Sequence, residues 1–186
     1  MNYDELVPLG LDYQSFLEKY ATPEQRQRWD RFHELVDLTD TQQELIKSFV
    51  REMKVLVVAG AWCGDCVNQC PIMAKIAELN PNIQLRFFDR DDHSEFAAEM
   101  SVCGGQRVPA VLFLNEDNQP CGRYGDRTIS KYRQMISDMT GAACPTGLIP
   151  PEEKLTQEVI ADWIVEFERN QYVMRTSPRL RKKHND

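Results

Sequence analysis

Three of the six cysteines in the chain stand close together, at positions 63, 66 and 70. Cys63 follows a short apolar run and opens a predicted helix. The unpaired N–H groups and the dipole at a helix N-terminus stabilise a thiolate, which is the reactive form of cysteine. One helical turn brings Cys66 beside Cys63, close enough for a disulfide. The spacing therefore predicts an exposed attacking thiol and a shielded resolving thiol, with the carboxylate of Asp65 opposing the thiolate.

The other cysteines are expected to play lesser parts. Cys70 lies four residues after Cys66 on the same helical face, where Cβ atoms are about 5–6 Å apart, against roughly 3.8 Å in a disulfide. We therefore expect Cys70 to be a buried packing residue. Cys103 falls in a predicted loop; we favour a plain loop cysteine over one that approaches the active site. For Cys121 and Cys144 the sequence indicates no role.

Short apolar or alternating segments predict strands, and longer apolar periodicity predicts helices. The strands are predicted at residues 54–60, 83–89, 108–114 and 119–124. The helices are predicted at residues 63–79, 94–100 and 129–139, with Gly141 ending the last of them. The order β-α-β-α-β-β-α favours an α/β fold, a mixed sheet with helices on both faces.

Helical segments are predicted on both sides of this unit. Residues 22–25 and 41–44 each match the capping-box pattern of a helix start. After a Pro-rich link, residues 144–151, a last helix is predicted whose apolar stripe packs on the domain: Leu155, Val159, Trp163 and Phe167. The basic segment 175–184 is expected to be a solvated, frayed end.

The central segment resembles the thioredoxin superfamily from Met53 to Met139. An apolar strand leads into Trp62-Cys63-Gly64-Asp65-Cys66, Pro71 stands five residues after Cys66, and Val108-Pro109 opens a later strand. The resemblance implies a thioredoxin-like fold with a four- to five-stranded sheet. It also implies a redox-active Cys63–Cys66 disulfide, a cis Val108–Pro109 bond, and substrate binding by Trp62, Val108 and Pro109.

The same resemblance divides the chain into three parts. Residues 1–52 are an N-terminal helical extension, residues 53–141 the thioredoxin-like domain, and residues 142–186 a C-terminal extension with one helix and the basic tail.

Three departures from the family pattern bear on activity. Val57 stands where thioredoxins bury an acid, Asp65 replaces the proline between the cysteines, and Ala110 follows Pro109.

Composition excludes several classes of protein. The chain has 186 residues, and 22 basic minus 29 acidic residues give a net charge of −7, which disfavours nucleic-acid binding. No stretch approaches the roughly 20 apolar residues of a membrane span. No secretory signal is visible, so we expect a cytoplasmic protein.

Expected partners are a disulfide-containing protein or small thiol substrate and a reductase that recycles the dithiol; no cofactor is expected.

The leading hypothesis is a thiol–disulfide oxidoreductase that serves cell redox homeostasis through Cys63 and Cys66. Two other classes stay open. The spacing of Cys63, Cys66 and Cys70 resembles part of a ferredoxin cysteine run, which would hold an iron–sulfur cluster or zinc. A non-catalytic module could instead use the thioredoxin-like surface to hold a partner.

Overall fold

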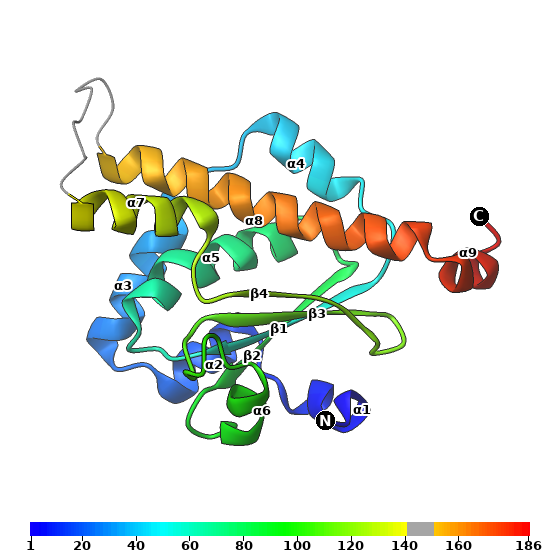
Figure 1. The fold of residues 1–186 in the computed structure, drawn as a ribbon, viewed down its shortest axis with the longest axis horizontal. Coiled ribbons are helices and arrows are strands. Elements are labelled where there is room, and N and C mark those ends of the chain that lie inside the picture. Colours follow the sequence, from blue (N-terminus) through cyan, green and yellow to red (C-terminus); the bar gives the residue numbers. More distant parts are fainter. Residues whose placement is uncertain (141–150) are drawn as a thin grey trace.

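The structure, a computed structural model, describes residues 1–140 and 151–186. Four strands form one mixed sheet in the order β2-β1-β3-β4 (Figure 1). They are β1 (Met53–Ala59), β2 (Ile83–Asp89), β3 (Ala110–Asn115) and β4 (Pro120–Gly125). β1 pairs in parallel with β2 and antiparallel with β3, and β3 and β4 form an antiparallel hairpin. The predicted topology is confirmed, with the smaller of the expected strand numbers.

Helices cover both faces of the sheet. In Figure 1, α5 (Gly64–Glu78), α7 (Ile129–Thr140) and α8 (Pro151–Thr176) lie on one side, and α6 (Ser94–Glu99) lies on the other. Because α5 directly follows β1, its N-terminus stands at the carboxyl end of the central parallel pair. Gly141, Cys144 and the link through residue 150 lie outside the described residues.

The N-terminal helices are α1 (Tyr3–Leu6), the 3-10 helix η1 (Val7–Leu9), α2 (Tyr13–Tyr20), α3 (Pro23–Leu35) and α4 (Asp40–Lys47). The capping box of Thr22 and Gln25 at the start of α3 is confirmed. The predicted start of the next helix at Thr41 is wrong. Thr39 is the N-cap, because Gln42 stands three residues after it and completes a reciprocal capping box.

The N-terminal segment is held on the free edge of the sheet beside β2. Leu11 exchanges two backbone hydrogen bonds with Phe87 of β2, at 3.0 and 2.7 Å. Phe16 and Trp29 pack their rings together and are fully buried, and Phe16 also contacts Phe87. These helices therefore share one apolar core with the sheet.

The apolar stripe predicted for the last helix does pack on the domain. Val159, Trp163 and Phe167 of α8 are buried. Trp163 meets Tyr124 of β4 edge to face, and Phe167 meets Phe113 of β3 in the same way. None of the helices in the described part of the chain has the length and apolar character to cross a membrane.

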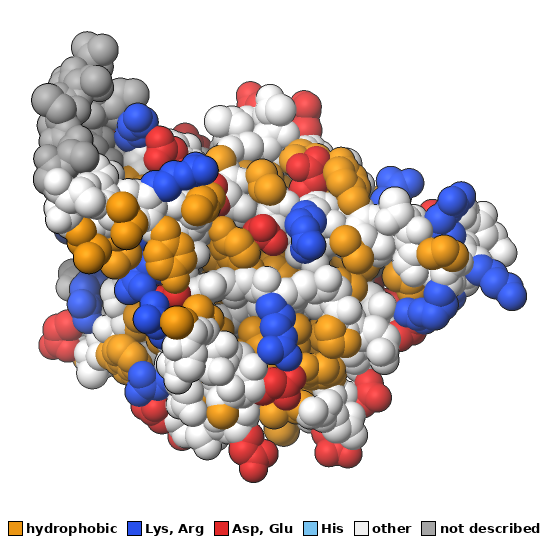
Figure 2. Space-filling view, in the orientation of Figure 1, with side chains coloured by type: hydrophobic (Ala, Val, Ile, Leu, Met, Phe, Trp, Pro, Cys, Tyr) orange, Lys and Arg blue, Asp and Glu red, His pale blue; other side chains and the backbone are white. Residues whose placement is uncertain are grey.

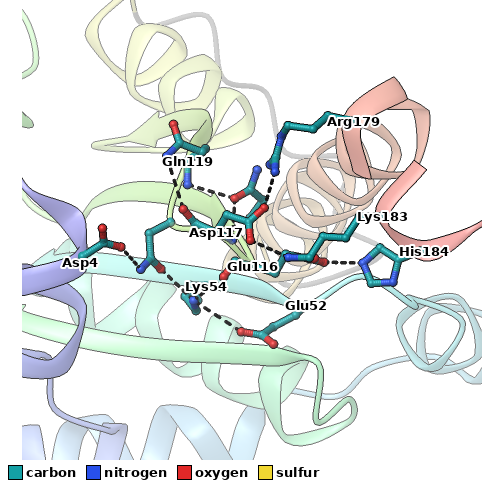
Figure 3. Close-up of polar contacts among 11 residues, drawn as sticks. Asp4, Glu52, Lys54, Glu116, Asp117, Gln119, Arg179, Lys183 and His184 are labelled. Carbon is teal, nitrogen blue, oxygen red and sulfur yellow. Dashed lines mark hydrogen bonds and ion pairs between the residues drawn. The ribbon is translucent and has the colours of Figure 1, made fainter. Parts of the chain in front are cut away.

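The basic tail is not frayed, so that prediction is wrong. Residues Pro178–His184 form a further helix, α9, and Leu180 within it is 1% exposed. Figure 2 shows Lys and Arg side chains gathered over α9. Figure 3 shows that they face the acidic turn between β3 and β4. Lys183 lies 2.6 Å from both Glu116 and Asp117, and Arg179 also pairs with Asp117.

We expect this attachment to weaken in acid. Hydrogen bonds from Lys183 and Arg179 lower the pKa of Asp117 below its usual range. A carboxyl whose pKa is lower in the folded state stabilises that state above its unfolded pKa, and this contribution is lost as the pH falls through the folded value. Asp117→Asn should likewise loosen α9 at neutral pH.

Tryptic cleavage within α9 measures this loosening, because the helix carries the basic residues that trypsin cuts. The Asp117→Asn variant should be cleaved several-fold faster, with a stability loss of at most about 1 kcal/mol, since surface ion pairs contribute little. Asp138→Asn on α7 is the matched control. Equal cleavage rates in the two variants would show that the ion pairs of Asp117 do not hold the helix, and that Leu180 and Glu116 suffice.

Candidate active site

The structure brings Cys63 and Cys66 together at the start of α5. Cys63 is the N-cap residue: its backbone N–H donates to Gly60 O at 3.0 Å, and its carbonyl accepts from the N–H of Val67 at 3.0 Å. Cys63 is half-buried and Cys66 fully buried, and both are free thiols. The outer sulfur is therefore accessible and the inner one shielded, in the order that the spacing predicts.

The Val108–Pro109 segment lies directly against the outer thiol. Its peptide bond is cis, as predicted. The Cys63 thiol donates to the carbonyl oxygen of Val108, with 3.4 Å between sulfur and oxygen. The two segments are 45 residues apart in sequence. The fold thus places a backbone carbonyl next to the outer sulfur of the pair.

Trp62, the residue before Cys63, has an exposed side chain. Its side chain is 46% exposed. The indole ring lies on Gly60, where an added Cβ would come within 2.7 Å of it, so only glycine allows this close approach. The guanidinium of Arg90, which follows β2, stacks over the ring 4.6 Å from its centroid. The residue that precedes Cys63 therefore presents an exposed aromatic ring held between Gly60 and Arg90.

The two thiols titrate as a pair. Burial raises the pKa of Cys66 well above its ordinary value. The hydrogen bond with Cys66, together with burial and the charge of the second sulfur, raises the pKa of Cys63, while the backbone N–H groups of Cys66 and Asp65 lower it. Both pKa values are therefore raised above that of a free thiol, and the second proton of the pair is held more tightly than the first.

A charged network beside the dithiol was not foreseen from the sequence. Asp65 pairs with Arg127 at 2.6 Å, so its charge opposes the Cys63 thiolate less than predicted. Arg127 also pairs with the buried Asp126 at 2.7 Å. Asp126 accepts from the hydroxyl of Tyr132 on α7, and its carbonyl accepts from Gln69 of α5 at 3.0 Å. Nothing local in the sequence indicates this network, since its members come from separate elements.

The N-terminal helices also support the site. The indole N–H of Trp29 in α3 donates to the carbonyl of Ala61 at 2.9 Å, and Trp29 is fully buried. This bond fixes the turn that carries Trp62 and Cys63. Sequence reasoning placed Trp29 on an apolar helix face but did not connect it to the site.

The remaining cysteines are spread through the fold. Cys70 is fully buried in α5, as predicted, and Cys103 is exposed in the turn 102–105. Cys121 is half-buried on β4. Val57, in place of the family's buried acid, is fully buried in β1. In residues 1–140 and 151–186, no three His, Cys, Asp or Glu side chains are grouped to hold a metal ion, so the metal hypothesis gains no support.

This geometry defines a class of protein. A helix-terminal dithiol facing a cis-proline segment, on a mixed β2-β1-β3-β4 sheet, is a thioredoxin-like arrangement. The thioredoxin family profile matches residues 10–140, and the chain belongs to this family. Thioredoxin H-type 1 of Nicotiana tabacum is 28% identical over 95 residues, 50% of this chain and 69% of that protein. Thioredoxin H1 of Arabidopsis thaliana is 32% identical over 68 residues, 35% of this chain and 57% of that protein.

Two solved structures resemble nearly the whole chain, including both helical extensions. A protein of unknown function from Pseudomonas aeruginosa is 22% identical with a TM-score of 0.66, covering 90% of this chain and 98% of that one. An HIV epitope-scaffold is 22% identical with a TM-score of 0.63, and the match covers 90% of this chain and 99% of that one. At this identity the likeness establishes the fold, and the fold class inferred from the sequence is confirmed.

Proposed function

We propose that the protein is a thiol–disulfide oxidoreductase that uses Cys63 as the attacking thiol and Cys66 as the resolving thiol. The observation that carries the proposal is the position of the Cys63 sulfur: half-exposed, at the N-terminus of α5, and 3.4 Å from the Val108 carbonyl. Membership of the thioredoxin family supports an oxidoreductase in general.

The proposed reaction proceeds in two exchanges. The Cys63 thiolate attacks one sulfur of a substrate disulfide; that S–S bond breaks, and the other substrate sulfur leaves and takes a proton. The Cys66 thiolate then attacks the Cys63 sulfur, releasing the second substrate thiol and forming the Cys63–Cys66 disulfide. The substrate gains two electrons and two protons, and the protein loses the same number. A thiol-based reductant must then restore the dithiol.

The exposed surface of the molecule favours a protein as the substrate. Val108 and Pro109 form a backbone surface against which an extended substrate segment would pair, with Trp62 beside it. Apolar side chains of α7 are also exposed: Ile129 at 48%, Ile136 at 58% and Met139 at 79%. Exposed apolar surface of this kind suits a polypeptide partner. A cytoplasmic location belongs to the same proposal, because a reducing compartment would keep the dithiol ready.

The experiment that tests the proposal is turnover of a protein disulfide with a thiol reductant. The wild-type protein should catalyse reduction, and equilibration in a redox buffer followed by peptide mapping should find Cys63 paired with Cys66. A protein that binds disulfide substrates without turning them over would instead be a non-catalytic interaction module. Pairing of Cys103 or Cys121 in place of Cys63 would contradict the assignment of the site.

A further inference from the structure

We propose that Arg127 is a positioning residue for the first exchange: it holds the carboxylate of Asp65 in an ion pair, so that this charge does not oppose formation of the Cys63 thiolate. The inference rests on the proposed function, in which Cys63 attacks as a thiolate. The two charged residues come from separate elements, since Asp65 lies in the first turn of α5 and Arg127 follows β4.

The chain itself places Asp65 close to the attacking sulfur. Asp65 stands between the two cysteines, two residues after Cys63. The Cα atoms of residues two apart are separated by at most about 7 Å. A negative charge that close to a thiol disfavours its ionisation, and the screening length of roughly 8–10 Å in salt does not remove the effect. An unpaired Asp65 would therefore make the Cys63 thiolate harder to form.

Arg127 meets the Asp65 carboxylate directly. Its Nη2 atom lies 2.6 Å from Oδ2 of Asp65, and the two side chains are only 21% and 20% exposed. Salt screens an ion pair that is shielded in this way less than one on the open surface. The positive charge of Arg127 therefore offsets the charge of Asp65 at the start of α5.

A buried acid holds Arg127 in place. The carboxylate of Asp126, which is 2% exposed, accepts from Nη1 of Arg127 at 2.7 Å. The same carboxylate accepts from the hydroxyl of Tyr132 on α7, and Arg107 lies 3.8 Å from it. The backbone carbonyl of Asp126 accepts from Gln69 of α5 at 3.0 Å. The guanidinium is thus fixed with one nitrogen on each of two carboxylates.

Two other groups act on the charge of Cys63. Arg90, which follows β2, interacts with the Cys63 sulfur and also pairs with Asp91 at 2.8 Å. On α5, the hydrogen bond with Cys66 raises the pKa of Cys63. Arg90 and Asp91 stay unchanged when the ion pair beside the dithiol is removed, so that removal isolates the effect of the pair.

The pH dependence of Cys63 alkylation by iodoacetamide measures this effect, because the reagent is neutral and reacts with the thiolate. In Cys66→Ser protein, Cys63 titrates without its partner thiol. Adding Arg127→Gln should move the midpoint about half to one pH unit higher, which means about three- to tenfold slower reaction below the midpoint. Adding Asp65→Asn to that protein should reverse most of the shift.

The single variant Asp65→Asn separates a charge effect from the loss of a structural contact. Its midpoint should not rise, because Arg127 already offsets the charge that it removes. A rise equal to that in Arg127→Gln would overturn the inference, since loss of the contact alone would then explain both. Arg127→Lys keeps the charge and should keep the midpoint. Arg123→Gln on β4, which breaks a 3.0 Å pair with Glu99, is the matched control and should also leave it unchanged.

Arg127→Gln leaves the buried Asp126 with one partner fewer, which costs stability. The comparison is therefore repeated in Asp126→Asn protein, where that charge is absent and the loss of Arg127 leaves no buried carboxylate unpaired. Equal midpoints with and without Arg127 in this background would refute the role of Arg127 and leave the proposed function standing. Absence of disulfide turnover in the wild-type protein would instead contradict the proposed function.

Discussion

Cys63→Ser should abolish disulfide turnover, whereas Cys66→Ser should stop the reaction after one exchange. The serine hydroxyl is a far weaker nucleophile than a thiolate at neutral pH, so the first variant has nothing with which to open the substrate. The second variant keeps the attacking sulfur beside the Val108 carbonyl but has no resolving thiol. It should accumulate a mixed disulfide with half of the substrate attached at Cys63.

Intact-protein mass spectrometry under non-reducing conditions measures this directly. Cys66→Ser should gain the mass of one substrate half, removable by added thiol, while Cys63→Ser should gain none. Cys121→Ser is the matched control, because Cys121 is half-buried on β4 and its nearest hydrogen-bond partner is the carbonyl of Gln119. It should turn over substrate like the wild type. A trapped substrate on Cys103 in either variant would refute the assignment of the attacking thiol.

The central fold could be predicted because its signals are local. β1 and β3 are apolar except for Lys54 in β1 and Asn115 at the end of β3, as strands buried on both faces tend to be, and the loops of the domain carry Gly, Pro and Asn. The start of α4 was missed because two threonines, Thr39 and Thr41, each precede a glutamine or glutamate by three residues. The pattern alone does not choose between two such starts.

The tail was missed for a different reason. Its charge is visible in the sequence, but a charged run becomes ordered only if complementary groups meet it. Those groups, Glu116 and Asp117, lie more than 60 residues away, and only the fold brings them to α9. Leu180, a single apolar residue in the basic run, was the one local sign that this helix has a buried side.

The candidate site likewise has parts that could be predicted from the sequence and parts that could not. The spacing of Cys63 and Cys66 is local, so their arrangement at the helix start followed from it. The position of Val108 and Pro109 beside Cys63 followed from the family resemblance. The pairing of Asp65 with Arg127 followed from neither, because 62 residues separate them and no periodicity links the turn after β4 to α5. Charge compensation across a fold is visible only in three dimensions.

Gly125→Ala should damage both stability and substrate reduction. Gly125 ends β4 opposite Ala110, with φ at +130°, a conformation that residues with a Cβ rarely adopt. A Cβ there would lie 2.5 Å from the carbonyl oxygen of Pro109 and 3.1 Å from the Cα of Ala110. Both contacts are with backbone, so a side chain cannot rotate away to relieve them. The variant should lose about 3 kcal/mol or more of unfolding free energy.

The functional loss should exceed what the loss of stability explains. To relieve the overlap, the Pro109 segment must move, and with it the Val108 carbonyl that faces Cys63. Gly105→Ala is the matched control, because its added Cβ meets nothing closer than 3.6 Å. Denaturant unfolding gives the stability difference, and turnover measured well below the melting transition of both variants gives the activity. Full activity in a folded Gly125→Ala protein would show that reduction does not depend on the position of the Pro109 segment.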